Sequence, residues 1–377
     1  MQTPRSDRSV HLDAVRAIAA LIVFTGHTRS FFLQFWRSAV GLGRQPLPSE
    51  LLTVSSPSHE AVIVFFVLSG FLVGGAVLRS FRTDNWSWER YLTARITRLW
   101  VVLIPALVLT AILDAVGKAI SPADSIYWQS DEARAGSSSA LTFLGNIAFL
   151  QTILVRTFGS DGQLWSLANE FWYYILFPIL MIVVLRRNAL ARLSAGVAMI
   201  AMLLFVGQSI AIYSVIWLMG LIPYLPRRNL SARYFRITLS VSTAILVSTA
   251  IALVKLRLNL FLSDVILGFV FAIWCYAALH KAPGSSASFS IYAWAATHLS
   301  RMSYTLYLVH VPLLALLSGA IVGSWNPWPL DVSHLAAAAA IWLFVLAASY
   351  GFYLVFERNT DVIREYCYRL IPGRTRP

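Results

Sequence analysis

Charged residues are scarce in this sequence. Only 12% of its 377 residues are Asp, Glu, Lys or Arg, whereas 58% are hydrophobic. A soluble domain usually carries about a quarter charged residues and somewhat under half apolar ones. So large an apolar excess does not fit inside one globular core, because the surface of a soluble protein must face water. The composition therefore excludes a disordered chain, a collagen and a coiled coil, and the mean hydropathy of +0.68 indicates a membrane protein.

Cysteine and acidic residues are also few. Cys275 and Cys367 lie far apart and lack the spacing of metal ligands, so we expect neither a disulfide nor a metal site. The 17 acidic residues face 30 basic ones, nearly all arginine, which gives a net charge of +13. The arginines lie in short segments between long apolar runs, which is typical of cytoplasmic loops in membrane proteins. We therefore predict the lipid bilayer, and no nucleic acid, as a partner.

The apolar runs predict an all-α polytopic membrane protein with about ten transmembrane helices. Arginine-rich segments fall on one predicted side, so we expect both termini in the cytoplasm. Residues 141–156 are short for a span and are predicted to be re-entrant or interfacial. We see no internal repeat and no soluble domain, so residues 1–377 are predicted to form one transmembrane domain ending in a basic cytoplasmic tail at 358–377. The predicted spans are 12–35, 61–78, 99–116, 164–185, 193–208, 209–225, 237–254, 259–279, 300–320 and 335–356.

Two connecting segments carry further expectations. Residues 79–98 hold five arginines and form the strongest basic loop of the chain, which we place in the cytoplasm. Its part from Arg90 to Arg98 either binds an anionic cofactor or only sets the topology. Residues 280–299 are expected to form a polar inner loop.

Ionisable groups inside the first predicted span are the first candidate site, because such groups are costly in a bilayer. Arg16 and His27 are eleven positions apart, about three turns, so they lie on nearly one helix face, roughly 16 Å apart. A guanidinium near the inner surface suits a phosphate group, and an imidazole at mid-depth suits general-base work. Asp13, one turn before Arg16, is placed to orient it. A snorkelling arginine and a packed histidine explain the pair equally well without a function.

Later spans hold other polar residues. Glu170 opens a span near the predicted outer surface, where an interfacial aromatic belt with a solvated carboxylate is the simpler interpretation. His310 shares a helix face with Ser303 and lies near Tyr307, so a core histidine bonded to that tyrosine is the simpler interpretation there. The small residues of Gly70-x-x-x-Gly74 predict close helix packing. No role is predicted for His11, His59, His280, His298 and His334.

Taken in order, these segments resemble the membrane-bound acyltransferase 3 family, whose members acylate extracytoplasmic glycans and some small glycosylated metabolites. The resemblance covers residues 12 to 357, and it departs from the family at Asn359, where a proline is frequent. The matching segments are the arginine and histidine spaced by ten residues at Arg16 and His27, "FFxLSGFL" at 65–72, an arginine-rich stretch at 91–99, "LWSLxxE" at 164–170, "SYxxYLxH" at 303–310, and an aromatic and glutamate at 353–357.

The resemblance implies an O-acyltransferase of the bacterial cytoplasmic (inner) membrane. It would transfer a short acyl group from cytoplasmic acyl-CoA, and acetyl is the expected group. The acceptor would be a hydroxyl of an extracytoplasmic carbohydrate such as an exopolysaccharide or lipopolysaccharide. Acyl-CoA is then a co-substrate, and no permanently bound cofactor is expected.

The resemblance also implies roles for single residues. His27 would act as general base or as transient acyl carrier. The other expected residues are Arg16 and Glu170 in catalysis, Arg16 with Arg95 and Arg98 at the CoA phosphates, and Asp13, Ser69, Tyr304 and His310 in support. The intramembrane Arg, His and Glu also suit a proton-coupled transporter or flippase of a polysaccharide precursor, which is the alternative function.

Overall fold

The computed structural model describes residues 7–33, 58–129, 137–225, 231–256, 258–279, 291–323 and 327–370, and these are almost wholly helical. Within these ranges, nine helices are long and apolar enough to cross a membrane. The predicted all-α polytopic membrane fold is therefore confirmed. The helices fall into two compact units, and α1 (Asp7–Phe32) and α10 (Trp165–Leu185) each contribute residues to both.

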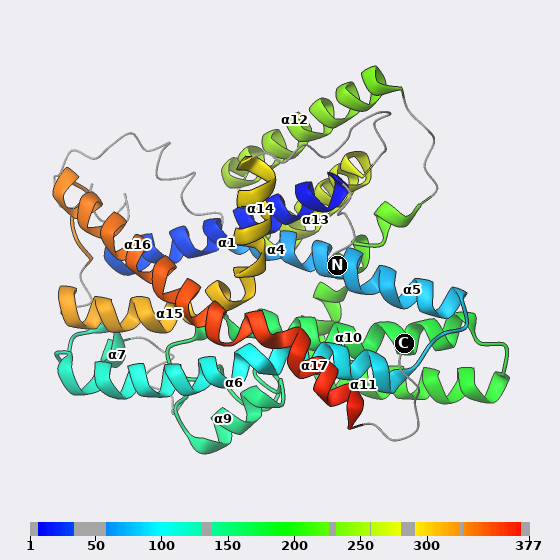
Figure 1. The fold of residues 1–377 in the computed structure, drawn as a ribbon, viewed down its shortest axis with the longest axis horizontal. Helices are drawn as coiled ribbons and strands as arrows, with labels where there is room; N and C mark the ends of the chain where they lie inside the picture. The colour runs from blue at the N-terminus through cyan, green and yellow to red at the C-terminus, as the bar shows by residue number, and fades with distance from the viewer. Residues whose placement is uncertain are drawn as a thin grey trace. The chain divides into compact units, whose positions relative to one another are not determined.

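The first unit contains the beginning of α1 and most of α10. Helix α13 is central to it and packs against α4, α11 and α12 (Figure 1). Asn188 and Asn259 cap α11 and α13 by accepting hydrogen bonds from backbone N–H groups of the first turn. The other elements of this unit are α4 (Ser58–Ser69), a π-helical turn (Gly70–Gly74), α5 (Gly75–Arg82), α11 (Ala189–Met219), a 3₁₀ turn (Ile222–Tyr224), α12 (Ala232–Leu256), α13 (Leu260–Ala278) and α14 (Ile291–Arg301).

Close packing around Gly70 confirms the prediction made from its small-residue motif. A Cβ atom on Gly70 would lie 1.8 Å from the carbonyl oxygen of Trp217, so only glycine fits where the two backbones touch. Gly70 also begins the π-helical turn, a distortion that often accompanies functional sites. The preceding residue, Ser69, is buried beside this contact.

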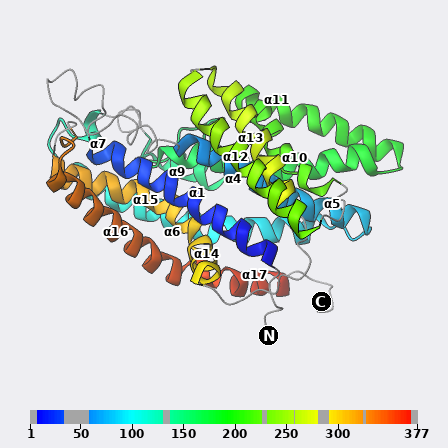
Figure 2. The same ribbon diagram turned by 90° about the horizontal axis from the view of Figure 1, so that it is seen from above.

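The second unit contains the end of α1 and the first turn of α10. Helix α15 packs against both α6 and α16, as Figures 1 and 2 show from two directions, and α17 packs against α6. Its elements are α6 (Trp88–Ile120), α7 (Ile126–Gln129), α9 (Ala140–Ile147), a 3₁₀ turn (Gly162–Leu164), α15 (Ser303–Leu317), a π-helical turn (Ser318–Val322), α16 (Val332–Val355), a 3₁₀ turn (Glu357–Asn359) and α17 (Thr360–Arg369).

Two side chains fix the start of α15 in this unit. The Glu357 carboxylate accepts hydrogen bonds from the Thr305 N–H at 3.0 Å and the Thr305 hydroxyl at 2.6 Å. A carboxylate at a helix N-terminus satisfies backbone donors and complements the helix dipole. The Tyr304 hydroxyl donates to the Leu99 carbonyl of α6 at 3.2 Å. Glu357 and Tyr304 therefore position α15.

The predicted spans 193–208 and 209–225 both overlap α11, which counts once among the nine candidate spans of the described residues. The helix is broken at Gly207, whose φ of 80° and ψ of 171° are not helical. A positive φ of this size favours glycine, and no proline or charged loop separates the two halves. The break therefore lies close to the predicted boundary between the two apolar runs.

The structure also bears on three other predicted segments: the basic loop, the polar inner loop and the segment 141–156. The arginines at 90–98 lie on the first turns of α6, which begins at Trp88 after a Ser87 cap, and not in a loop. Residues 291–299 are helical in α14, whereas the rest of the predicted inner loop lies outside the described residues. The segment 141–156 forms only α9, whose eight residues rise about 12 Å, too short to cross a bilayer as a helix.

Candidate active site

The second unit brings together two histidines that are 283 positions apart in the chain. His27 of α1 and His310 of α15 share a hydrogen bond of 2.8 Å between His27 Nδ1 and His310 Nε2. Their rings are stacked, with centroids 5.1 Å apart and planes inclined by 14°. His310 is only 1% exposed, whereas His27 is half-buried. His310 therefore bonds to the predicted catalytic histidine, and not to Tyr307 as the simpler interpretation expected.

The backbone of α15 decides how protons are arranged in this pair. His310 Nδ1 lies 2.7 Å from the Leu306 carbonyl oxygen, which only accepts hydrogen bonds, so Nδ1 must carry hydrogen. With both rings neutral, His310 Nε2 then holds a lone pair and accepts from the Nδ1–H of His27. The remaining nitrogen of His27, Nε2, consequently holds a lone pair and is the basic atom of the pair.

Aromatic side chains pack around the pair within the same unit. Phe24 meets His310 edge-on at 5.6 Å between ring centroids, and it stacks on Trp342 at 5.2 Å. Tyr307 lies 6.2 Å from the His310 ring and donates its hydroxyl hydrogen to the Gln163 carbonyl at 2.9 Å. The Ser166 hydroxyl also shares a hydrogen bond of 2.6 Å with the Tyr307 hydroxyl, so the "SYxxYLxH" and "LWSLxxE" segments are in contact.

Arg16 lies in the first unit, in a polar group at the start of α1. Its Nη1 donates to the Ser300 hydroxyl at 3.2 Å and lies 3.6 Å from the Asp13 carboxylate. Ser300 in turn donates to Asp13 at 3.1 Å. The structure thus places Asp13 where it orients the guanidinium, and it adds Ser300 of α14, which the sequence did not suggest.

Glu170 also lies in the first unit, and it is held by side chains from two helices. Ser69 of α4 donates to its Oε1 at 2.8 Å, and the Tyr174 hydroxyl makes a short hydrogen bond to the same oxygen. Trp217 of α11 donates to the Ser69 oxygen at 3.1 Å. Glu170 is therefore a positioned, half-buried carboxylate, and Ser69 contacts it directly.

The remaining predicted site residues are the arginines of α6, in the second unit. Arg95 is half-buried and lies over the Tyr91 ring, 5.9 Å from its centroid, whereas Arg98 is exposed. Both lie within the first turns of α6, so a helical stretch presents them.

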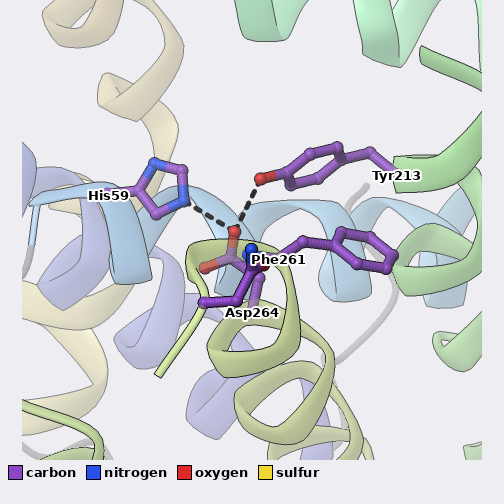
Figure 3. Close-up of polar contacts among 5 residues, drawn as sticks. His59, Tyr213, Phe261 and Asp264 are labelled. Carbon is purple, nitrogen blue, oxygen red and sulfur yellow. Dashed lines mark hydrogen bonds and ion pairs between the residues drawn. The ribbon is translucent and has the colours of Figure 1, made fainter. Parts of the chain in front are cut away.

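Sequence reasoning missed a second site that contains a histidine, in the first unit. Figure 3 shows His59 and Tyr213 directed at the carboxylate of Asp264, with Phe261 packed beside the tyrosine. His59 Nε2 lies 2.8 Å and the Tyr213 hydroxyl 2.7 Å from the same Asp264 oxygen. Asp264 is 1% exposed inside α13. An acid within the predicted span 259–279 was the signal available in the sequence.

A buried acid in the second unit was also missed. Asp161 is 1% exposed, and no described residue donates a hydrogen bond to its carboxyl oxygens. Burial raises the pKa of Asp161 well above its usual range, and the nearby charge of Asp114 raises it further. Asp114 itself accepts from the N–H and hydroxyl of Ser160, both at 2.7 Å. Asp161 is thus a buried carboxyl group just before the "LWSLxxE" segment.

Two curated relatives of the chain are named as O-acetyltransferases. Over 199 residues the chain is 30% identical to an O-acetyl transferase of Shigella phage Sf6, a match covering 52% of this chain and 51% of that protein. It is 27% identical over 199 residues to a putative peptidoglycan O-acetyltransferase of Bacillus subtilis strain 168, a match covering 51% of this chain and 26% of that protein. The matches thus span about half, or less, of the length of these relatives. No solved structure matches the chain.

The family pattern described as "Acyltransferase domain" matches residues 10–356, which is nearly the whole chain. This range includes the histidine pair, Arg16 and Glu170. The predicted family is confirmed, and its description agrees with the predicted enzyme class. The chain therefore belongs to the acyltransferase domain family.

Proposed function

We propose that this chain is a membrane O-acyltransferase that transfers an acetyl group from acyl-CoA to a hydroxyl of a carbohydrate. Family membership supports the acyl transfer, and the names of the phage and Bacillus relatives support acetyl as the group and an oxygen as its acceptor. The helical, membrane-type fold supports action at a bilayer. The proposed site of action is the bacterial cytoplasmic membrane, with donor inside and acceptor outside.

The arrangement of His27 and His310 is the observation that carries this proposal. In the proposed step, His27 Nε2 takes the proton of the acceptor hydroxyl while the hydroxyl oxygen bonds to the thioester carbonyl carbon. The carbon–sulfur bond breaks, CoA leaves as a thiolate, and the proton on the imidazole finally neutralises that thiolate. His310 accepts from His27 Nδ1–H, and this bond holds the lone pair of Nε2 available.

The charged groups have proposed roles in binding. Arg16, oriented by Asp13 and Ser300, would hold a phosphate of the CoA donor, because a guanidinium matches phosphate geometry. Arg95 and Arg98 of α6 would contact further phosphates. Glu170, held by Ser69 and Tyr174, would accept hydrogen bonds from hydroxyl groups of the carbohydrate.

Two variants test the proposal in purified protein given radiolabelled acetyl-CoA and a glycan acceptor. His27→Ala and Arg16→Ala should each lose transfer while membrane expression stays normal. His298→Ala is the matched control, since its exposed ring bonds only to the Trp294 carbonyl among the described contacts. Full activity of His27→Ala would refute the proposed base.

The same preparation separates the enzyme from a transporter. An acyltransferase leaves label on the glycan, and mass spectrometry of cell-surface glycans should show one acetyl mass that disappears without the gene. If label never moves, and unmodified substrate instead crosses vesicles under a proton gradient, the chain is a transporter.

A further inference from the structure

The last helix of the second unit, α17, packs one side against protein. Its exposed side carries both apolar and charged side chains. Tyr368 faces α6 and donates to the Arg90 carbonyl at 3.2 Å. Val362, Tyr366 and Leu370 are spaced by four residues, so they share one face within an arc of about 80°. They are 69%, 62% and 65% exposed. An apolar stripe of this length is thus left uncovered by the described chain.

The charges of α17 prevent it from entering the hydrocarbon core. Asp361 pairs with Arg364 at 2.8 Å, and Glu365 pairs with Arg369 at 2.7 Å. Each such charge at the centre of a bilayer costs about 2.5–3.5 kcal/mol on the insertion scale. An exposed surface that is half apolar and half charged fits the boundary between lipid and water.

The position of α17 supports the same location. It follows α16, a helix of 24 residues, after the 3₁₀ turn Glu357–Asn359, and Figure 2 shows it turned out of the line of α16. The candidate span Val332–Arg369 contains both helices, and its charged residues lie in α17, so we place α17 where the chain leaves the membrane. A helix in this place meets the headgroups on its exposed side.

The net charge around α17 selects the kind of lipid. Residues 358–377 contain five arginines and two acidic residues. The exposed Arg90 and Arg98 lie on α6, the helix on which α17 packs. Within α17 two acidic residues balance two arginines, so the excess positive charge lies in the flanking residues and on α6. An amphipathic helix in such surroundings gains binding free energy from anionic headgroups in addition to the burial of its apolar face.

We propose that α17 is a membrane-surface helix that docks on anionic phospholipid headgroups through the stripe Val362, Tyr366 and Leu370 and the arginines beside it. The docking holds the first turns of α6, where Arg90, Arg95 and Arg98 lie, at the bilayer surface. This proposal does not depend on acyl transfer.

A dye on each side of α17 tests the docking. In a Cys367→Ser background, Cys275 is fully buried and stays unlabelled, so Val362→Cys and Asp361→Cys can each carry one nitrobenzoxadiazole group. The proteins are placed in nanodiscs of phosphatidylcholine with or without phosphatidylglycerol. We expect blue-shifted emission and protection from iodide at position 362, and water-like emission at the matched control position 361. Equal emission at the two positions would overturn the docking.

Lipid charge is tested in the same discs. Phosphatidylglycerol should increase the protection at position 362, added salt should reverse the increase, and Arg358→Gln should weaken it by about fivefold. Equal protection in both kinds of disc would overturn the anionic selectivity. Hydrogen exchange of residues 360–369 in the unlabelled wild type guards against a dye artefact. Slower exchange in anionic discs supports the proposal, and unchanged exchange contradicts it.

Discussion

His27 and His59 each make a hydrogen bond of 2.8 Å within a helical unit, but their partners are of opposite kinds. His27 meets a second imidazole, whose far nitrogen is already committed to a backbone carbonyl. His59 meets the carboxylate of Asp264, which also accepts from Tyr213. The first partner fixes a tautomer without bringing any charge, whereas the second brings a full negative charge.

The difference in partners indicates a catalytic role for His27 and a structural role for His59. A neutral pair whose tautomer is fixed leaves one lone pair free to take a substrate proton, which a general base requires. A carboxylate buried in a membrane helix instead needs partners to compensate its charge, and His59 and Tyr213 supply them. We therefore assign His27 to the chemistry and His59 to holding α4 against α13 and α11. The predictions below test this division, beginning with the largest expected effect.

Removal of each imidazole is the direct test. We expect His27→Ala to reduce the rate of acetyl transfer by about 10²–10⁴-fold, the usual contribution of a general base, and His59→Ala to retain most of the rate. Initial rates with labelled acetyl-CoA, normalised to folded protein in the membrane fraction, measure both. An equal loss in the two variants would show that the division is wrong.

His310 should have the next largest effect, because it acts only through His27. His310→Leu removes the acceptor for His27 Nδ1–H, and we expect a loss of about 100-fold in kcat with little change in KM for acetyl-CoA. His310→Gln should recover part of the rate, since an amide oxygen accepts the same hydrogen bond. If leucine and glutamine give the same rate, His310 only fills space.

The helical membrane fold could be predicted because apolar runs of about 20 residues are visible in the sequence itself and match the thickness of a bilayer. Helix ends could be predicted less well, since the predicted span began at residue 99, whereas α6 begins at Trp88 after the Ser87 cap. In a lipid-facing chain, nearly every position is apolar. Hydrophobic periodicity therefore gives little information about which face of a helix meets protein.

Most side-chain contacts within the candidate sites could not be predicted, because they join residues that lie far apart in the sequence. His27 and His310, or His59 and Asp264, lie more than 200 positions apart, and no spacing rule connects them. The expected contact of Asp13 with Arg16 was local, at one helical turn, and the structure contains it. Asp264 was visible as an acid in an apolar run, but its partners depend on how α4 and α11 pack.

The carboxylate of the second pair should matter for stability more than for rate. Asp264→Ala leaves the Tyr213 hydroxyl and the His59 Nε2–H without their acceptor, and we expect a fall of about 1–3 kcal/mol in the free energy of unfolding. Chemical denaturation in detergent measures it. Leu262→Ala is the control on the same helix, because Leu262 is 48% exposed. An unchanged stability of Asp264→Ala would remove the structural role assigned to this site.

The smallest effect is expected at Asp331, which forms an exposed version of the same pair. Asp331 caps α16 and accepts from the His334 N–H at 2.9 Å, the Ser333 hydroxyl at 2.7 Å and the His334 ring at 2.8 Å. These bonds, the backbone one first, hold the pKa of Asp331 below its usual range. Asp331→Ala should therefore lower the Tm at neutral pH. We expect this fall in Tm to be smaller than the fall caused by Asp264→Ala, because solvent screens an exposed charge.

The acid dependence sharpens this last comparison. A carboxyl group with a lowered pKa in the folded state stabilises the protein above its unfolded pKa of about 4, and this contribution is lost as the pH falls through that value toward the folded pKa. Asp331→Asn keeps an acceptor for the helix N–H but carries no charge, so its Tm should approach that of the wild type as the pH is lowered from 6 to about 3. Parallel Tm curves for the two proteins would mean that only the neutral cap, and not the charge, stabilises the start of α16.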